Sequence, residues 1–130
     1  MDIHELCSES DRIAREHGFQ CHWHNVPEKL MLVVTELAEA MEAYRHLKPA
    51  TLSSLDYSQG YKITAALLDD EQEKEAYAQG EVWENFREEI ADAFIRLGNL
   101  SHALHLDIKA AIEDKMRKNE ERPFMHGKNC

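Results

Sequence analysis

Apolar positions recur with the period of an α-helix along most of this chain, and no stretch alternates with the period of a β-strand. A first helix is predicted over residues 2–17, where Gly18 provides a typical stop signal. The face expected to be buried carries Ile3, Leu6, Ser10, Ile13 and His17. The chain is therefore expected to begin with an amphipathic helix.

A second helix is predicted after Asn25, a favourable N-cap that Glu28 follows three residues later in a capping-box pattern. Pro49 is expected to end this helix. Its apolar residues are spaced four, three, four and three positions apart, as in a bundle helix that buries one stripe. We call this stripe the Leu37 seam, and its residues are Leu30, Val34, Leu37, Met41 and Tyr44.

Residues 49–81 have the least regular pattern in the chain. The segment SLDYSQGY is typical of a loop, and LLDDEQEKEAYAQG predicts a short solvated helix that Gly80 closes. A connection of this length is unusual inside a compact bundle. It has three alternative interpretations: an insertion, a lid or an interface element.

Two further helices are predicted toward the C-terminus. The third begins near Val82, and the fourth runs from an N-cap at Asp107 to a stop at Pro123. The apolar stripe of the third helix carries Phe86, Ile90, Ala93, Leu97 and Leu104. A length of 130 residues fits one domain. The predicted fold is therefore a single all-α domain, 1–130, built as a bundle of four main helices.

Composition narrows the classes of partner. The chain has 25 acidic and 15 basic residues and a formal net charge of −10, so its surface is expected to repel a nucleic acid polymer. The N-terminus is polar and no apolar run approaches the roughly 20 residues that span a bilayer, so we expect a cytoplasmic protein without membrane contact. A small anion accompanied by a divalent cation remains compatible with this charge.

The three cysteines, Cys7, Cys21 and Cys130, form no CxxC pair and are expected to be thiols in a reducing compartment. Cys21 lies close to His22 and His24 in the sequence. A structural zinc site needs four ligands, however, and no second cluster supplies the missing one. We therefore do not predict zinc there.

One acidic hexapeptide occurs twice, as ELAEAM at 36–41 and as EIADAF at 89–94. On a helix, Glu36 and Glu39 project about 60° apart beside the apolar stripe, and Glu89 and Asp92 have the same relation to theirs. Such a pair alone is usually solvated surface, but a second copy in matching register argues against coincidence. The repeat predicts two helices that direct paired carboxylates toward one pocket.

Four adjacent carboxylates would repel one another unless a counter-charge were present. Mg²⁺ supplies that charge, because it prefers oxygen ligands and keeps open positions for water and phosphate. A carboxylate-bridged di-iron centre would instead use Glu-x-x-His pairs, and no Glu in this chain has His three residues later. The sequence therefore predicts a phosphate-handling magnesium site.

The two hexapeptides, followed by KMRKNEERP at 115–123, resemble the MazG-like all-α nucleoside triphosphate pyrophosphohydrolases, including single-domain dCTP pyrophosphatases. The resemblance covers roughly residues 20–48 and 84–128. It implies a four-helix bundle of that type with an insertion between the second and third main helices. It also implies hydrolysis of NTP or dNTP to the monophosphate and pyrophosphate in nucleotide-pool sanitation, dependent on Mg²⁺ or Mn²⁺.

The same resemblance implies roles for individual residues. Metal ligands are expected at Glu36, Glu39, Glu89 and Asp92, with Glu36 and Glu39 also catalytic and the identity of the base left open. Phosphates and sugar would meet Lys115, Asn119, Arg122 and Lys128, although basic residues there would also complement a helix dipole. Trp23 and His24 would border the base, and a buried Trp23 that closes the bundle is the alternative.

Two other functions share this pattern. Phosphoribosyl-ATP pyrophosphohydrolysis would use the same site on another substrate. A non-catalytic helical interaction module would instead carry its acids as solvated surface. Family members form dimers or tetramers, so a homodimer or homotetramer is expected.

Overall fold

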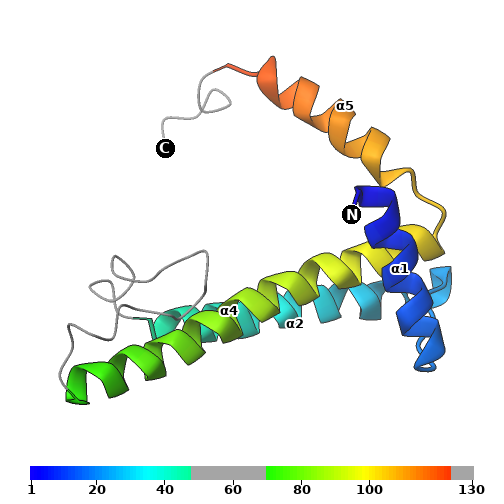
Figure 1. Ribbon diagram of the computed structural model, residues 1–130. Coiled ribbons are helices and arrows are strands. Elements are labelled where there is room, and N and C mark those ends of the chain that lie inside the picture. The colour runs from blue at the N-terminus through cyan, green and yellow to red at the C-terminus, as the bar shows by residue number, and fades with distance from the viewer. Residues whose placement is uncertain (48–69, 124–130) are drawn as a thin grey trace. The chain divides into compact units, whose positions relative to one another are not determined.

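The computed structural model describes residues 1–47 and 70–123, except for the side chains of 70 and 72–77, and these ranges are helical without any strand (Figure 1). The elements are α1 (Ile3–Glu16), a 3-10 turn (Trp23–Asn25), α2 (Val26–Arg45), α4 (Asp70–Ala103) and α5 (Ile108–Glu120). The predicted all-α class is confirmed. No helix in the described ranges has the length and apolar character needed to cross a membrane.

The chain divides into two compact units, Met1–Val26 with Leu97–Cys130, and Pro27–Arg96. In the first unit, α1 begins and ends where local signals predict. The Asp2 carboxylate accepts the Glu5 N–H at 2.8 Å, and the Glu5 carboxylate accepts the Asp2 N–H at 3.3 Å. This capping box satisfies two amide donors that have no partner within the helix. At the other end, Gly18 has a φ of +85°, which glycine adopts without steric strain.

The buried face of α1 agrees with the predicted one at Ser10 but not at Ile13. Cys7, Ser10 and Asp11 are buried, whereas Ile13 is 46% exposed. The last turns of α4 approach this face closely, because a Cβ added at Gly98 would lie 3.3 Å from Ser10 Oγ. The small residues thus set the packed face in place of the larger apolar residues.

Helix α5 belongs to the same unit and contacts α1. Its start agrees with the prediction, because the Asp107 carboxylate accepts the Ala110 N–H at 3.1 Å. Glu121 is its C-cap, two residues before the predicted stop at Pro123. The local capping signals therefore located both ends of this helix.

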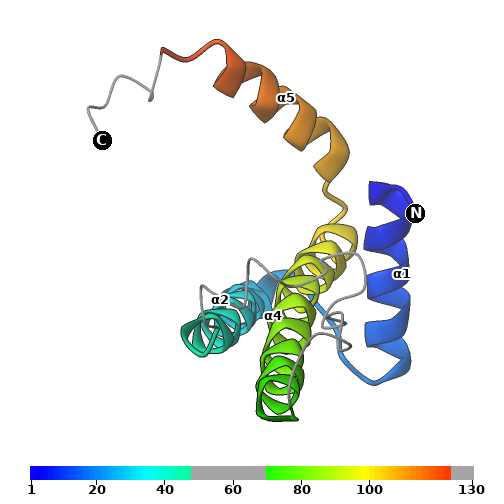
Figure 2. The ribbon, with the colours of Figure 1, turned by 60° about the vertical axis from the view of Figure 1, so that its left-hand side comes forward.

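In the second unit, α2 and the first part of α4 lie side by side and run in opposite directions (Figures 1 and 2). The buried residues Val33, Ala40 and Ala43 on α2 and Ala93 on α4 are small or medium in size. The buried side chain of Gln79 donates to the His46 carbonyl at 2.9 Å, just beyond the C-terminus of α2. This bond satisfies one of the carbonyl groups that a helix end leaves without a partner.

Two local predictions in this unit are wrong. Gly80 does not close a short helix, because α4 continues from Asp70 to Ala103 without a break. One glycine costs a helix only about 1 kcal/mol relative to alanine, and Gly80 is buried among helix-forming neighbours. Asn25 is part of the 3-10 turn, where its side chain accepts the His22 N–H at 2.9 Å, so it does not cap α2 by the predicted pattern. The rest of the predicted connection, 49–69, lies outside the described residues.

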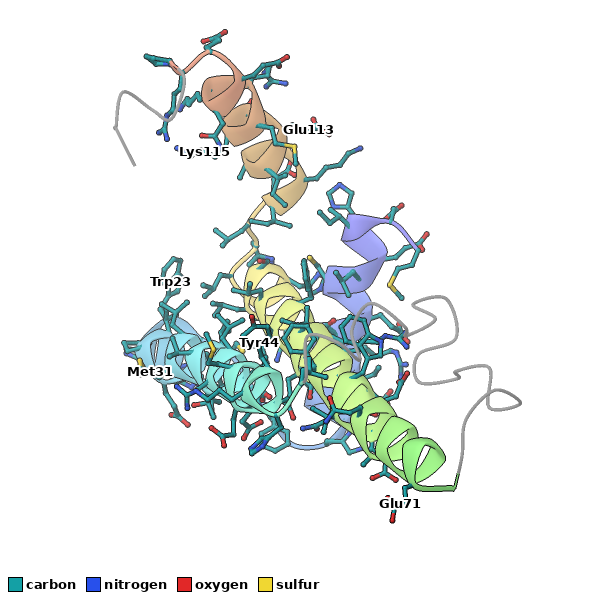
Figure 3. The ribbon with its side chains drawn as sticks, turned by 90° about the vertical axis from the view of Figure 1, so that its left-hand side faces the viewer. Trp23, Met31, Tyr44, Glu71, Glu113 and Lys115 are labelled. Carbon is teal, nitrogen blue, oxygen red and sulfur yellow. The ribbon has the colours of Figure 1, made fainter. Side chains whose placement is uncertain are left out.

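The Leu37 seam is the third correction. Its members, predicted to be buried, have exposed fractions of 45–55% in Leu30, Val34, Leu37, Met41 and Tyr44. Met31 beside them is 60% exposed (Figure 3). The buried face of α2 instead carries Val33, Glu36, Ala40 and Ala43. The Leu37 seam is therefore about half-exposed among the residues that the structure describes. On the third predicted stripe, Ala93 is buried but Leu97 is 43% exposed.

Candidate metal centre

Glu36 lies on the buried face of α2 although it carries a charge. It is 7% exposed, and the residues one turn before and after it, Val33 and Ala40, are buried as well. The short side chains of Ala40 and Ala43 allow α4 to come close, since interaxial distance depends on the side chains at the contact. The helix pair thus encloses this carboxylate instead of leaving it in solvent.

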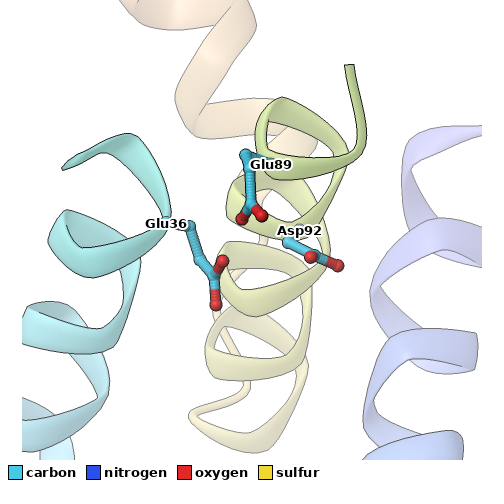
Figure 4. A group of neighbouring side chains, drawn as sticks. All are labelled: Glu36, Glu89 and Asp92. Carbon is cyan, nitrogen blue, oxygen red and sulfur yellow. The ribbon is translucent and has the colours of Figure 1, made fainter. Parts of the chain in front are cut away.

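Helix α4 supplies Glu89 and Asp92, which lie one turn apart and share one side of the helix. One carboxylate oxygen from each of Glu36, Glu89 and Asp92 lies within 4.8 Å of the other two. Figure 4 shows Glu36 on α2 beside the turn of α4 that carries the other two acids. We call these three residues the acid cluster. The structure thus brings three of the four predicted ligands together.

The fourth predicted ligand, Glu39, lies beside the acid cluster at the edge of a hollow. It is exposed, and its carboxylate interacts with those of Glu36 and Glu89. The hollow has a volume of about 360 Å³, which is enough for several water molecules or a small anion. Its lining consists of Glu39, Glu42, Ala43, His46, Val82, Asn85 and Glu89.

Arg96 is a member of the site that the sequence reasoning missed. Its Nε donates to Glu36 Oε1 at 2.7 Å, and the side chain of Glu36 is 9% exposed against 40% for Arg96. Arg96 follows Asp92 by four residues, so the two share one face of α4. That spacing was the available signal, but acid–base pairs four residues apart are common on helix surfaces.

The acid cluster shifts the pKa values of two carboxyl groups in opposite directions. Burial alone would raise the pKa of Glu36, but hydrogen bonds with Arg96 and Glu89 and the charge of Arg96 outweigh it and lower this pKa. The hydrogen bond that Glu89 shares with Glu36 raises the pKa of Glu89 to about 7, with help from burial and from Glu39. The pair thus holds one proton more readily than two separate carboxyl groups would.

The residues fit a hard divalent cation by two criteria. Three carboxylates and the adjacent Glu39 face one arginine, so negative charge is in excess around Glu36 even when Glu89 is protonated. Oε2 of Glu89 is buried and has no hydrogen-bond partner among the residues that the structure describes. Oxygen atoms in this state are suitable ligands for Mg²⁺ or Mn²⁺.

The other acids near the hexapeptides remain at the surface. Glu42 pairs with Arg45 at 3.1 Å and with His46 at 3.2 Å, and its side chain is 62% exposed. Glu88 is exposed as well. Neither belongs to the acid cluster, although Glu42 borders the hollow.

The predicted substrate contacts belong to the other unit. Trp23 is 71% exposed, so it does not close the helices as a buried residue, and His24 follows it in the 3-10 turn. Lys115 (Figure 3) is exposed on α5, as is Asn119, and Arg122 is exposed just after this helix. Lys128 lies outside the described residues.

Comparisons of the chain with protein-family models, with curated proteins and with solved structures give no match.

Proposed function

We propose that the chain is a metal-dependent nucleoside triphosphate pyrophosphohydrolase of the MazG-like all-α type. The observation that carries this proposal is the convergence of Glu36 with Glu89 and Asp92, acids from two copies of one motif, in excess over their single arginine. Charge of this kind inside a helix pair is unfavourable without a cation. The proposed reaction converts NTP or dNTP and water to the monophosphate and pyrophosphate, as part of nucleotide-pool sanitation.

Glu36, Glu89 and Asp92 would hold Mg²⁺, or Mn²⁺ in its place, and Glu39 would complete the set from the edge of the hollow. The bound cation supplies neutralisation of phosphate charge and a lower pKa for the attacking water. The hollow beside Glu39 has room for part of the polyphosphate. The water oxygen bonds to the α-phosphorus while the bond to the bridging oxygen breaks, and pyrophosphate leaves with that oxygen.

We propose that Glu39 accepts the proton of the attacking water. Glu36 is buried between α2 and α4 and does not line the hollow, so it is poorly placed to accept that proton. Glu39 lines the hollow where the water and substrate would lie. Glu36 would then act by holding the cation, and Trp23, His24, Lys115, Asn119, Arg122 and Lys128 would contribute to substrate binding.

The proposed enzyme is a homodimer or homotetramer. Half-exposed apolar residues recur along five positions of the Leu37 seam, which runs over most of α2. An apolar stripe of this regularity is typical of a helix that packs against another helix. A second copy of the same chain provides such a helix.

A non-catalytic helical module is the competing hypothesis. The Arg96–Glu36 ion pair favours it, because that pair already compensates the buried acid of the acid cluster without a cation. The two hypotheses differ in what Mn²⁺ does. A metal centre binds Mn²⁺ at millimolar concentration or below and raises the thermal stability of the protein, whereas a solvated set of acids does neither.

The deciding experiment measures pyrophosphate release from a panel of canonical, oxidised and methylated nucleotides with Mg²⁺. We expect activity in the wild type and a loss of at least about 100-fold in Glu39→Gln and Asp92→Asn, because removal of outer-shell metal partners alone costs about 10- to 100-fold. Glu88→Gln removes an exposed acid of the same helix as Asp92 and is the control. Full activity in both site variants, with unchanged circular dichroism, would contradict the proposed site.

A further inference from the structure

Arg96 holds an unusual position for a surface arginine. Five arginines of the described ranges pair with acids three or four residues away on their own helix, as Arg87 does with Glu84 at 2.8 Å; they are Arg12, Arg15, Arg45, Arg87 and Arg117. Arg96 reaches from α4 to α2 and donates to Glu36, the one buried acid of the acid cluster. The residue thus links the two helices of this unit through the acid cluster.

The contact engages one of the two carboxylate oxygens of Glu36, an acid that the cation would bind. Arg96 Nε lies 2.7 Å from Oε1 of Glu36, which is the distance of a strong charge-assisted hydrogen bond. A metal ion bound to this oxygen would replace the guanidinium as the partner. The positive charges of Arg96 and of the ion would also repel each other at short range.

We propose that Arg96 and a divalent cation compete for Glu36, so that Arg96 sets the metal affinity of the protein and is displaced when the cation binds. This inference rests on the proposed function, because it takes the acid cluster to be a metal centre. Arg96 then acts as the counter-ion of the metal-free state. It stabilises the ionised carboxylate of Glu36 until a cation binds.

The geometry explains why an arginine suits this role. Its charge persists at every physiological pH, so Glu36 remains a carboxylate when the cation is absent. The Arg96 side chain is 40% exposed, so the guanidinium has solvent beside it into which it can move. The carboxylate of Glu36, at 9% exposure, has no comparable freedom. The exchange therefore moves the arginine and leaves the acid in place.

The test is a calorimetric titration of Mn²⁺ alone into the wild type and Arg96→Gln. Arg96→Gln removes both the competing ion pair and the like charge, and each loss should raise the affinity for Mn²⁺. We expect Mn²⁺ to bind the variant about tenfold more tightly, a change equivalent to 1.4 kcal/mol. Arg87→Gln is the matched control, since it removes an arginine and its acid partner contact from the same helix outside the acid cluster. Its affinity for Mn²⁺ should equal that of the wild type.

The outcomes separate this inference from the proposed function. Equal or weaker binding by Arg96→Gln, with clear binding by the wild type, would overturn the competition and leave the metal centre standing. Binding by the variant alone would support the competition in its strongest form. Absence of binding by both proteins would refute the metal centre, and the inference would fall with it.

A second measurement keeps the inference testable if Arg96→Gln does not fold. The Nε–H group of Arg96 in the ¹⁵N-labelled wild type should give a distinct signal while it is bonded to Glu36, and Arg96→Lys identifies that signal by its loss. Addition of diamagnetic Mg²⁺ should shift it and speed its exchange with solvent. A signal that stays unchanged while Mg²⁺ saturates the protein would show that arginine and cation do not compete.

Discussion

The two apolar faces of α2 differ in how far they are buried. Glu36 and Leu37 are neighbours in the sequence and project about 100° apart. The face with Glu36 is buried and is built from Val33, Ala40 and Ala43, whereas Leu37 belongs to a larger and more regular seam that is half-exposed. On α2 the small and medium-sized residues are thus buried, whereas the large apolar residues of the seam stay half-exposed.

This difference has a consequence for the site. Small residues allow two helices to approach closely, and close approach is what brings carboxylates of α2 and α4 within 4.8 Å. Large residues in the same places would separate the helices and spread the acids apart. In the proposed enzyme, the face with Glu36 would serve the chemistry and the Leu37 seam would serve self-association.

The largest expected effect comes from Ala40→Leu, which adds bulk to the face with Glu36. Overpacking of a close helix contact costs about 1–3 kcal/mol, so unfolding in urea should begin at a lower concentration. The wider helix spacing should also weaken Mn²⁺ binding. Urea denaturation and calorimetry measure the two effects.

Met41→Leu is the control for this substitution, because it places the same side chain one position later, on the exposed seam. Its free energy of unfolding should stay within about 0.5 kcal/mol of the wild type, as is usual for surface changes. If both variants lost equal stability, the distinction between the two faces would be wrong.

Features with local causes were predictable from the sequence. The start of α1 at Asp2 and the start of α5 at Asp107 depend on residues within one turn, and both predictions are confirmed. The passage of α4 through Gly80 was missed, because the penalty for one glycine is small against the contacts of a long helix. Helix ends set by a strong cap are therefore easier to predict than helices that continue through a weak break.

The site shows the same division. The repeated hexapeptide led to Glu36, Glu89 and Asp92, because a matched register on two helices restricts where the side chains can go. Arg96 was missed, because an arginine four residues after an acid does not indicate that its partner lies on another helix. The buried face of α2 was misplaced for a related reason. Hydrophobic periodicity shows which stripe of a helix favours burial. It does not show whether the same chain or another chain buries that stripe.

A smaller effect on stability is expected when the Leu37 seam is altered. Leu37→Glu places a charge in the middle of an apolar stripe and should leave helical content unchanged while it prevents self-association. Sedimentation velocity should show an oligomer for the wild type and a monomer for the variant at equal concentration. Thr35→Glu introduces the same charge on the exposed side away from the seam and should remain oligomeric. A monomeric wild type would contradict the proposed assembly.

The smallest effect concerns pH, and it tests whether the face with Glu36 is under electrostatic stress without a cation. Glu89 has its pKa raised from 4.5 to about 7 by the bond with Glu36, so between these values the folded state keeps a proton that the unfolded state loses. Its contribution to stability is complete below pH 4.5 and is lost as pH rises through 7. Glu36, whose pKa is lowered, acts in the opposite sense and only below its usual range. Urea unfolding in EDTA from pH 5 to 8 should therefore show a decline in the wild type that is weaker in Glu89→Gln. Glu88→Gln should follow the wild type, and identical slopes in all three proteins would mean that the acids of α2 and α4 do not share a proton.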